Sequence, residues 1–381
     1  MLGRLHRRGT PGPIGRAARL LCIGALAAPV SLAAPASSQP RHTIGLVLTS
    51  WKHALYATPA GKEECPSGFA ADEKQQFLAM KNADEQLKAF GNFEARGPNG
   101  ESGRFNPTKV DDPIPHRELE TRKGFGLNLD GTPDGRATPK TCRHEKFSSP
   151  EGVQVDNQIA RVVGCTLGWR TDGFATEFIA KDFENSPLNR VVIEITGVDS
   201  EKNDPAVMVT IAKGRDKLVA STPGRFVPFL VQRIDDRYPR YIQTTGGRII
   251  DGVLTTDPIP VMDFSTWWVN HQGERRIRDL RLRLKLTPDG AEGFVGGYED
   301  LKYWLYTHSK SVSGNILKFS YPNYYYAALR YADGHKDPAS GQCRAISAAY
   351  KVTAVRAQIP HNPKGQSHVA MSYRASAEGS R

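Results

Sequence analysis

Residues 277–286 read IRDLRLRLKL, and they are followed by TPDG at 287–290 and by AEGFVGGY at 291–298. In the first segment leucines alternate with arginine or lysine, which is the period of a strand with one buried and one wet face. Pro-Asp-Gly is a strong turn former, so we expect the chain to return as a second strand. Antiparallel sheets tolerate one face in water. This stretch therefore predicts an antiparallel β-protein.

Shorter strands with the same kind of pattern precede this hairpin. They carry alternating apolar residues or β-branched runs, and turn sequences such as NDP (203–205) and TPG (222–224) separate them. The expected strands are 191–196, 207–212, 226–232, 241–244 and 248–254. Strands at this spacing indicate an antiparallel β-sandwich, jelly-roll-like, with a few short helices and a long N-terminal loop region.

The remaining regular elements lie on either side of this body. Residues 43–56 are expected to form a first strand and residues 346–359 a last one. Apolar residues with helical spacing predict a helix over 72–90 and two short helices at 299–306 and 323–331. The apolar side of the helix expected over 72–90 is explained by packing against the core, so we assign no function to it.

Residues 1–36 have the order of a secretory signal peptide. Five arginines precede an apolar run over 20–30, and Ala34-Pro35-Ala36 offers a small-x-small cleavage site. The apolar run is too short to span a bilayer, which needs about 20 residues. We therefore expect export to the periplasm or the medium.

This gives a division of the chain into four parts. Residues 1–36 are the signal peptide, and residues 37–187 are an N-terminal helix and polar loop region packed on the body. Residues 188–359 are the β-sandwich body with a helical annex, and the polar residues 360–381 are a disordered tail.

Charge and hydropathy exclude two classes of protein. The formal net charge is +11, of which the five leader arginines carry five units, so the rest carries about +6. Neither a basic run nor a recognition motif supports nucleic-acid binding. No segment after the leader reaches the length of a membrane span, so the mature chain is expected not to span a membrane.

Four cysteines remain after the leader, which suggests two disulfides in an exported protein. Sequence leaves three connectivities open. We favour Cys142–Cys165, which closes a short polar loop, with Cys65–Cys343 joining distant parts of the chain. The zinc alternative, with His144 between the cysteines, lacks any CxxC pair.

The densest group of oxygen-bearing side chains lies in residues 124–172. The candidate ligands of a calcium ion there are Asn128, Asp130, Asp134, Asp156 and Asn157. Calcium takes about 6–8 oxygen ligands from Gly-containing loops of this composition, although the spacing is not that of an EF-hand. The alternative is that Asp-Gly sequences form turns and Asp156 caps a helix over 158–164.

Aromatic residues crowd into residues 267–331. Those chosen as a ligand-binding set are Trp267, Trp268, Tyr303 and Trp304. Flat amphipathic rings line sugar and hydrophobic-ligand grooves as well as protein interfaces. The alternative is a helical cap over the β-body, which the helical spacing of Leu301, Trp304 and Leu305 favours.

Two motif segments resemble a group of exported proteobacterial proteins of unknown function. The first combines GLNLDG (126–131) with SPEGVQVDNQIARVVGC (149–165), and the second is DPASGQCRAIS (337–347). The resemblance covers about a fifth of the chain. The resemblance implies export, paired cysteines and an ion-stabilised loop. It does not imply any particular activity.

No nucleophile elbow, zinc-protease motif or phosphate-binding loop is present in the sequence. The leading hypothesis is therefore an exported envelope protein that binds an unknown ligand or envelope component. The alternative is a secreted hydrolase or lyase that acts on a polymer through carboxylates and tyrosines, which need only the right placement in space.

Overall fold

The structure is a computed structural model, and it describes residues 42–58, 61, 63–69, 97–111, 116–170, 173–221, 225–268, 271–310 and 321–361. The expected signal peptide, the helix at 72–90 and nearly all of the tail lie outside the described residues. Residues 40–187 and 188–359 belong to one compact unit, Pro40–Arg381, described below.

Strands dominate the described structure, which confirms the expectation of a mainly β-protein. Their bounds are β1 His42–His53, β2 Phe147–Ser148, β3 Gln154–Val155, β4 Val191–Val198, β5 Asp204–Lys213, β6 Leu230–Val231, β7 Ile242–Ile250, β8 Val253–Thr256, β9 Ile259–Trp268, β10 His271–Leu286, β11 Gly290–Asp300, β12 Gly334–Lys336 and β13 Cys343–Gln358.

The helices are few and short. They are α3 Ile159–Val163, α4 Phe174–Asn185, α5 Leu301–Lys310 and α7 Tyr321–Arg330, with single 3₁₀ turns η1 Leu167–Trp169, η2 Pro187–Asn189 and η3 Pro239–Tyr241. The two short helices expected near 299–306 and 323–331 are α5 and α7, so that prediction is confirmed.

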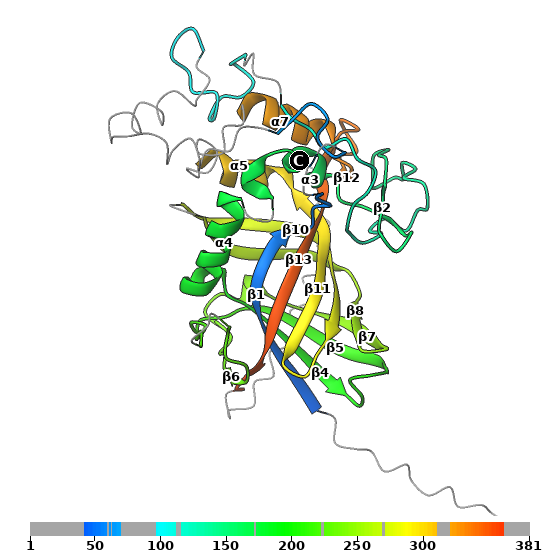
Figure 1. The fold of residues 1–381 in the computed structure, drawn as a ribbon, viewed down its shortest axis with the longest axis vertical. Coiled ribbons are helices and arrows are strands. Elements are labelled where there is room, and N and C mark those ends of the chain that lie inside the picture. Colours follow the sequence, from blue (N-terminus) through cyan, green and yellow to red (C-terminus); the bar gives the residue numbers. More distant parts are fainter. Residues whose placement is uncertain are drawn as a thin grey trace, which may run out of the picture. The chain divides into compact units, whose positions relative to one another are not determined.

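Eight antiparallel strands close into a barrel, in the order β1-β4-β5-β7-β8-β10-β11-β13 (Figure 1). Closure comes from β13, which pairs with β11 on one side and with β1 on the other. The expectation of a jelly-roll-like sandwich is therefore wrong. The strand pattern along the sequence is the same for both folds, and only the pairing of the first strand with the last removes the free edges.

The hairpin of residues 277–298 forms as expected, and Leu286 lies opposite Ala291 across the turn. Gly290 is required there, because a Cβ at this position would come within 1.9 Å of the Ala354 carbonyl oxygen on β13. Leu280, Leu282 and Leu284 are buried, as their alternation with basic residues predicts.

In the N-terminal half of β10 the alternation of buried and exposed side chains is reversed relative to the C-terminal half. The register with β11 shifts between Arg278 and Arg281, and Asp279 has a φ of 50°. Such a bulge reverses which side chains face the interior. Ile277 is buried, and Arg275, two residues before it, points to the same side.

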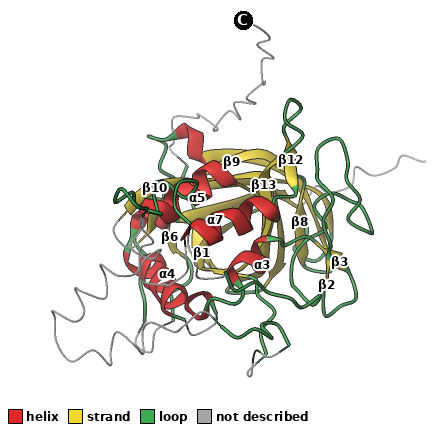
Figure 2. Ribbon diagram, turned by 90° about the horizontal axis from the view of Figure 1, so that it is seen from above, coloured by secondary structure: helices red, strands yellow, loops and turns green. Residues whose placement is uncertain are grey.

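The interior of the barrel is filled by one cluster of buried apolar side chains, which includes Ile193, Val209 and Leu282. The same cluster continues into the helices α3, α5 and α7, which lie over one end of the barrel (Figure 2). Helix α4 lies along the outside of the barrel wall near β1 (Figure 1). None of the helices in the described segments is both long and apolar enough to cross a membrane.

The four cysteines form two disulfides, Cys65–Cys165 and Cys142–Cys343. The expected pairs, Cys142–Cys165 and Cys65–Cys343, are therefore wrong. The fold explains the difference: the Cys142 amide donates to Asp333, directly before β12, and β12 pairs with the first residues of β13. Cys65 and Cys165 instead share a small buried cluster with Leu119 and Phe147.

Candidate functional site

The polar segment 124–135 is fixed to the outer face of the barrel. Leu127 and Leu129 pack on Tyr298 of β11 and Ala345 of β13, and Leu127 forms a bridge with Asp156. This packing holds the intervening side chains of the segment beside the strand ends, where residues 142–156 meet them.

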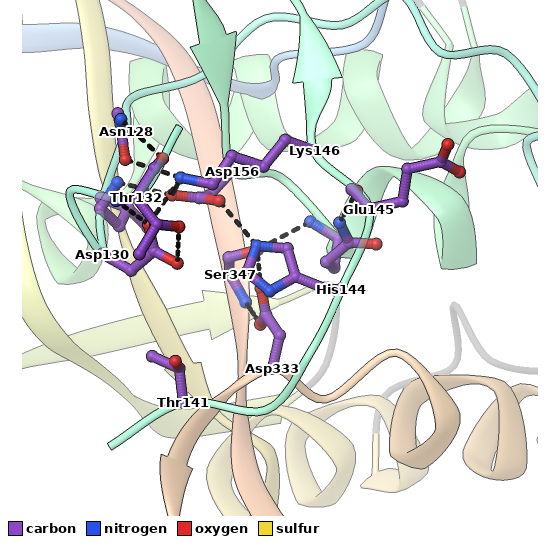
Figure 3. Close-up of polar contacts among 12 residues, drawn as sticks. Asn128, Asp130, Thr132, Thr141, His144, Glu145, Lys146, Asp156, Asp333 and Ser347 are labelled. Atoms are coloured by element: carbon purple, nitrogen blue, oxygen red, sulfur yellow. Dashed lines mark hydrogen bonds and ion pairs between the residues drawn. The ribbon is translucent and has the colours of Figure 1, made fainter. Parts of the chain in front are cut away.

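Lys146 is the centre of the polar cluster that results (Figure 3). Its Nζ lies 2.7 Å from Asn128 Oδ1, 2.6 Å from Asp130 Oδ1 and 3.2 Å from Asp156 Oδ2. The side chains of Lys146 and Asp130 are each 1 % exposed, and that of Asp156 is 0 % exposed. Three of the five expected calcium ligands therefore do meet, but they surround an ammonium group.

These residues do not fit a calcium ion as the sequence suggested. The position between the oxygens is taken by the charge of Lys146, and the other two expected ligands face elsewhere. Asp134 pairs with the exposed Arg136, and Asn157 bonds backbone groups, among them the Ala349 amide. Asp156 does not cap α3 either, because its Oδ2 accepts from the Leu129 amide.

His144 joins the cluster from the other side. Its Nε2 lies 2.7 Å from Asp156 Oδ1 and 3.5 Å from Asp333 Oδ2. Burial lowers the pKa of His144, but the hydrogen bond to Asp156 and the charge of Asp333 outweigh it and raise the pKa to about 9. Burial raises the pKa of Asp333 to about 7, although the His144 charge and the Ser347 amide oppose this shift.

We call this cluster the Lys146 network: Asn128, Asp130, His144, Lys146, Asp156 and Asp333. Burial alone raises the pKa of Asp130, but hydrogen bonds from Lys146 and Thr132 outweigh it and lower the pKa. The network ties residues 128–156 to Asp333, and through Asp333 to β13, because Asp333 also accepts from the Ser347 amide. Buried charges of this kind are held by their partners, so the arrangement is that of a structural crosslink.

The network makes stability depend on pH, and this dependence is a first prediction. An unfolded His144 loses its proton near pH 6.5, whereas the folded one holds it to about 9. Its contribution is therefore complete below about pH 6.5 and is lost as the pH rises to 9. The stability difference between wild type and His144→Gln should shrink by on the order of 2 kcal/mol between pH 6 and 9.5.

Denaturant unfolding of both proteins at several pH values measures this change, with His42→Gln, at an exposed ion pair, as the control. A difference that stays constant over this range would show that His144 is not protonated in the folded state.

A polar cavity of about 230 Å³ opens beside the network. Its lining residues are Arg122, Asp134, Glu145, Lys146, Ser148 and Gln154. Arg122 and Glu145 already pair across it at 2.7 Å, and both are largely exposed. The charges in this cavity therefore have partners within the protein or in water.

The four aromatic residues expected to bind a ligand do not form one surface. Trp304 is 3 % exposed and stacks on Tyr324 in the helical cap, as the alternative interpretation of these aromatics expects. Tyr303 lies against Arg276 outside the barrel, and the side chain of Trp268 lies outside the described residues. Trp267 alone of the set lines a pocket described here.

That pocket lies between α4, η2 and the barrel wall, and we call it the Arg275 pocket. Its volume is about 60 Å³, and its lining residues are Trp51, Ile179, Phe183, Asn189, Val191, Phe264, Ser265, Thr266, Trp267 and Arg275. Most of this surface is apolar. Arg275 is the one charged residue among them.

The guanidinium of Arg275 is held rigidly. Its Nε donates to Glu299 Oε1 at 2.5 Å, and its Nη2 also pairs with this carboxylate. The guanidinium carbon lies 4.2 Å from the ring centre of Tyr350 and 5.1 Å from that of Trp51. Burial lowers the pKa of Arg275, but the charge of Glu299 outweighs it, so the group stays cationic.

The rim of the pocket is also fixed by polar contacts. The Asn189 side chain accepts from the Trp267 amide at 2.6 Å and donates to the Trp267 carbonyl at 2.9 Å. It thereby takes the place of a neighbouring strand along the edge of β9. The Arg275 side chain remains 19 % exposed, whereas Glu299 behind it is 0 % exposed.

Sequence reasoning missed Arg275, Trp51 and Thr266 as site residues. One signal could have found the first of them: Ile277 breaks the alternation that Leu280, Leu282 and Leu284 establish. No protein-family model, curated protein or solved structure matches this chain.

Proposed function

We propose that this chain is an exported protein that binds a small ligand in the Arg275 pocket. The observation that carries the proposal is a rigidly held arginine, with its side chain 19 % exposed, in the wall of a mostly apolar pocket. Binding sites typically combine apolar walls with a few fixed polar groups that orient the ligand.

Two further features support the exported part of this proposal. Both disulfides join segments far apart in sequence, by 100 and 201 residues, and disulfides persist in oxidising compartments. The order of residues 1–36 is that of a secretory signal peptide.

A secreted hydrolase or lyase is the second candidate, and one observation favours it. The rings of His53 and Tyr350 lie 5.0 Å apart, and the Tyr350 hydroxyl donates to Glu299. A His/Tyr pair beside a carboxylate can transfer protons. However, these groups lie behind Arg275 rather than in the lining of the pocket. A pocket of about 60 Å³ also leaves no room for a polymer, so we prefer the binding function.

Filling the pocket should abolish binding. Ile179 lines it from α4 and is half-buried, so Ile179→Trp should occupy the space without unfolding the protein. Met208→Trp, at a residue that is 49 % exposed on β5, is the matched control. Folded wild type, I179W and M208W are screened against small apolar compounds by ligand-observed NMR.

We expect the compounds that bind wild type to bind M208W equally and to lose at least about tenfold in affinity for I179W. A wild-type protein that binds none of them, or an I179W variant that binds them as well as wild type does, would contradict the proposed function.

A further inference from the structure

Two residues that line the Arg275 pocket each carry a buried polar atom that has no hydrogen-bond partner among the described residues. They are Nε1 of Trp51 and Oγ1 of Thr266. Trp51 as a whole is 6 % exposed, and its indole nitrogen can only donate. Buried polar groups in native proteins nearly always have a partner, so we look for the partners of these two atoms in a ligand that the pocket holds.

Arg275 adds a third donor. Its Nε and Nη2 contact Glu299, and the guanidinium also bonds Tyr350, so these partners fix the group in the pocket wall. A ligand that satisfies the indole and the guanidinium must supply acceptors. Thr266 accepts or donates, so it adapts to whichever group arrives.

The charge of the ligand follows from Glu299. This carboxylate is fully buried and already neutralises Arg275 at contact distance. A second carboxylate would lose its hydration and would meet the field of Glu299, which water does not screen there. An uncharged acceptor such as a carbonyl receives the same hydrogen bonds without that cost.

The size of the ligand follows from the cavity. One water needs about 10–15 Å³ of this kind of volume, so about 60 Å³ holds roughly four waters. That is the space of a short branched group such as an acetyl, and because the pocket is open, a ring attached to that group would lie at its mouth. The rings of Trp51, Phe183, Phe264 and Trp267 supply flat apolar walls for it.

From these observations we infer that the Arg275 pocket takes an uncharged small molecule that carries a carbonyl acceptor on a single ring or a short branched chain. The inference rests on the proposed function and adds the chemical class of the ligand. Trp51, Thr266 and Arg275 are its recognition residues.

Three probes of one shape separate the possibilities: acetophenone, which is a neutral acceptor; toluene, which has no acceptor; and benzoate, which is an anionic acceptor. Their affinities for the folded mature protein are measured by ligand-observed NMR titration. We expect acetophenone to bind at least about tenfold more tightly than either of the other two.

Two conservative variants identify the donors. Trp51→Phe removes Nε1 and keeps a ring, and Thr266→Val removes Oγ1 at nearly constant shape. Each should lower the affinity for acetophenone by about three- to tenfold and leave that for toluene unchanged. Trp169→Phe, which changes a buried indole that does not line the pocket, is the control and should leave both affinities unchanged.

The outcomes separate the two claims. If none of the three probes binds wild type, the proposed function fails. If toluene binds as tightly as acetophenone, the pocket binds ligands but the acceptor inference is wrong. If benzoate binds most tightly, the ligand is an anion and the argument from Glu299 is wrong. If W51F and T266V bind acetophenone as wild type does, the two unpaired atoms are not the recognition groups.

Discussion

Replacing Lys146 with methionine is expected to destabilise the protein by about 4 kcal/mol at pH 7. The substitution keeps most of the side-chain volume but removes the charge that Asp130 and Asp156 share at 2.6 and 3.2 Å. Both carboxylates remain buried, Asp130 loses its counterion and Asp156 keeps only His144. Breaking such a buried pair typically costs about 3–5 kcal/mol. Equilibrium unfolding in denaturant, with the disulfides intact, measures the loss.

Two further variants make this prediction specific. Lys123→Met removes an exposed pair with Glu63 at 3.3 Å and should cost less than about 1 kcal/mol. Adding Asp130→Asn to K146M should recover part of the loss, since one unpaired carboxylate disappears. A K146M variant within 1 kcal/mol of wild type would show that the ammonium does not occupy the position between these oxygens.

Removal of either disulfide should have an effect of similar size. The bridges Cys65–Cys165 and Cys142–Cys343 close loops of about 100 and 200 residues, and the chain-entropy model assigns each about 4–5 kcal/mol. The double variants C65A/C165A and C142A/C343A should therefore each unfold at clearly lower denaturant concentration than wild type.

Peptide mapping under non-reducing conditions tests the pairing itself. The expected linked peptides contain Cys65 with Cys165 and Cys142 with Cys343. Peptides that link Cys142 to Cys165 would instead support the shorter loop that the sequence favours, and would contradict the place of Cys142 beside Asp333 and the start of β13.

The sequence predicts the strands well because their period is local. Leucine alternates with basic residues over 280–285, and the Pro-Asp-Gly turn follows, so both the hairpin and its buried face can be read directly. Closure into a barrel depends on β13 pairing with β1, about 300 residues away. No local pattern encodes that pairing, and the same strands suit a sandwich.

The polar sites show the same limit. Asn128, Asp130 and Asp156 are correctly expected to converge, since oxygen-rich turns are visible in the sequence. The cation that they surround is the ammonium group of Lys146. Its sequence neighbours, His144 and Glu145, are polar, so the local pattern does not predict that Lys146 is buried. The alternation of residues 280–285, continued toward the N-terminus, predicts that Arg275 faces solvent. The bulge near Asp279 shifts this alternation by one residue, so that Arg275 lies on the same side as the buried Ile277.

The indole N–H resonance of Trp51 provides the most direct test of the binding site. The protein has five tryptophans, so its indole ¹H–¹⁵N peaks can be resolved, and W51F assigns the one that matters. On addition of acetophenone to the folded protein, the Trp51 peak is predicted to shift downfield in a saturable way while the peaks of Trp169 and Trp304 stay in place. A Trp51 peak that does not move at any acetophenone concentration would contradict the assignment of this pocket as the ligand site.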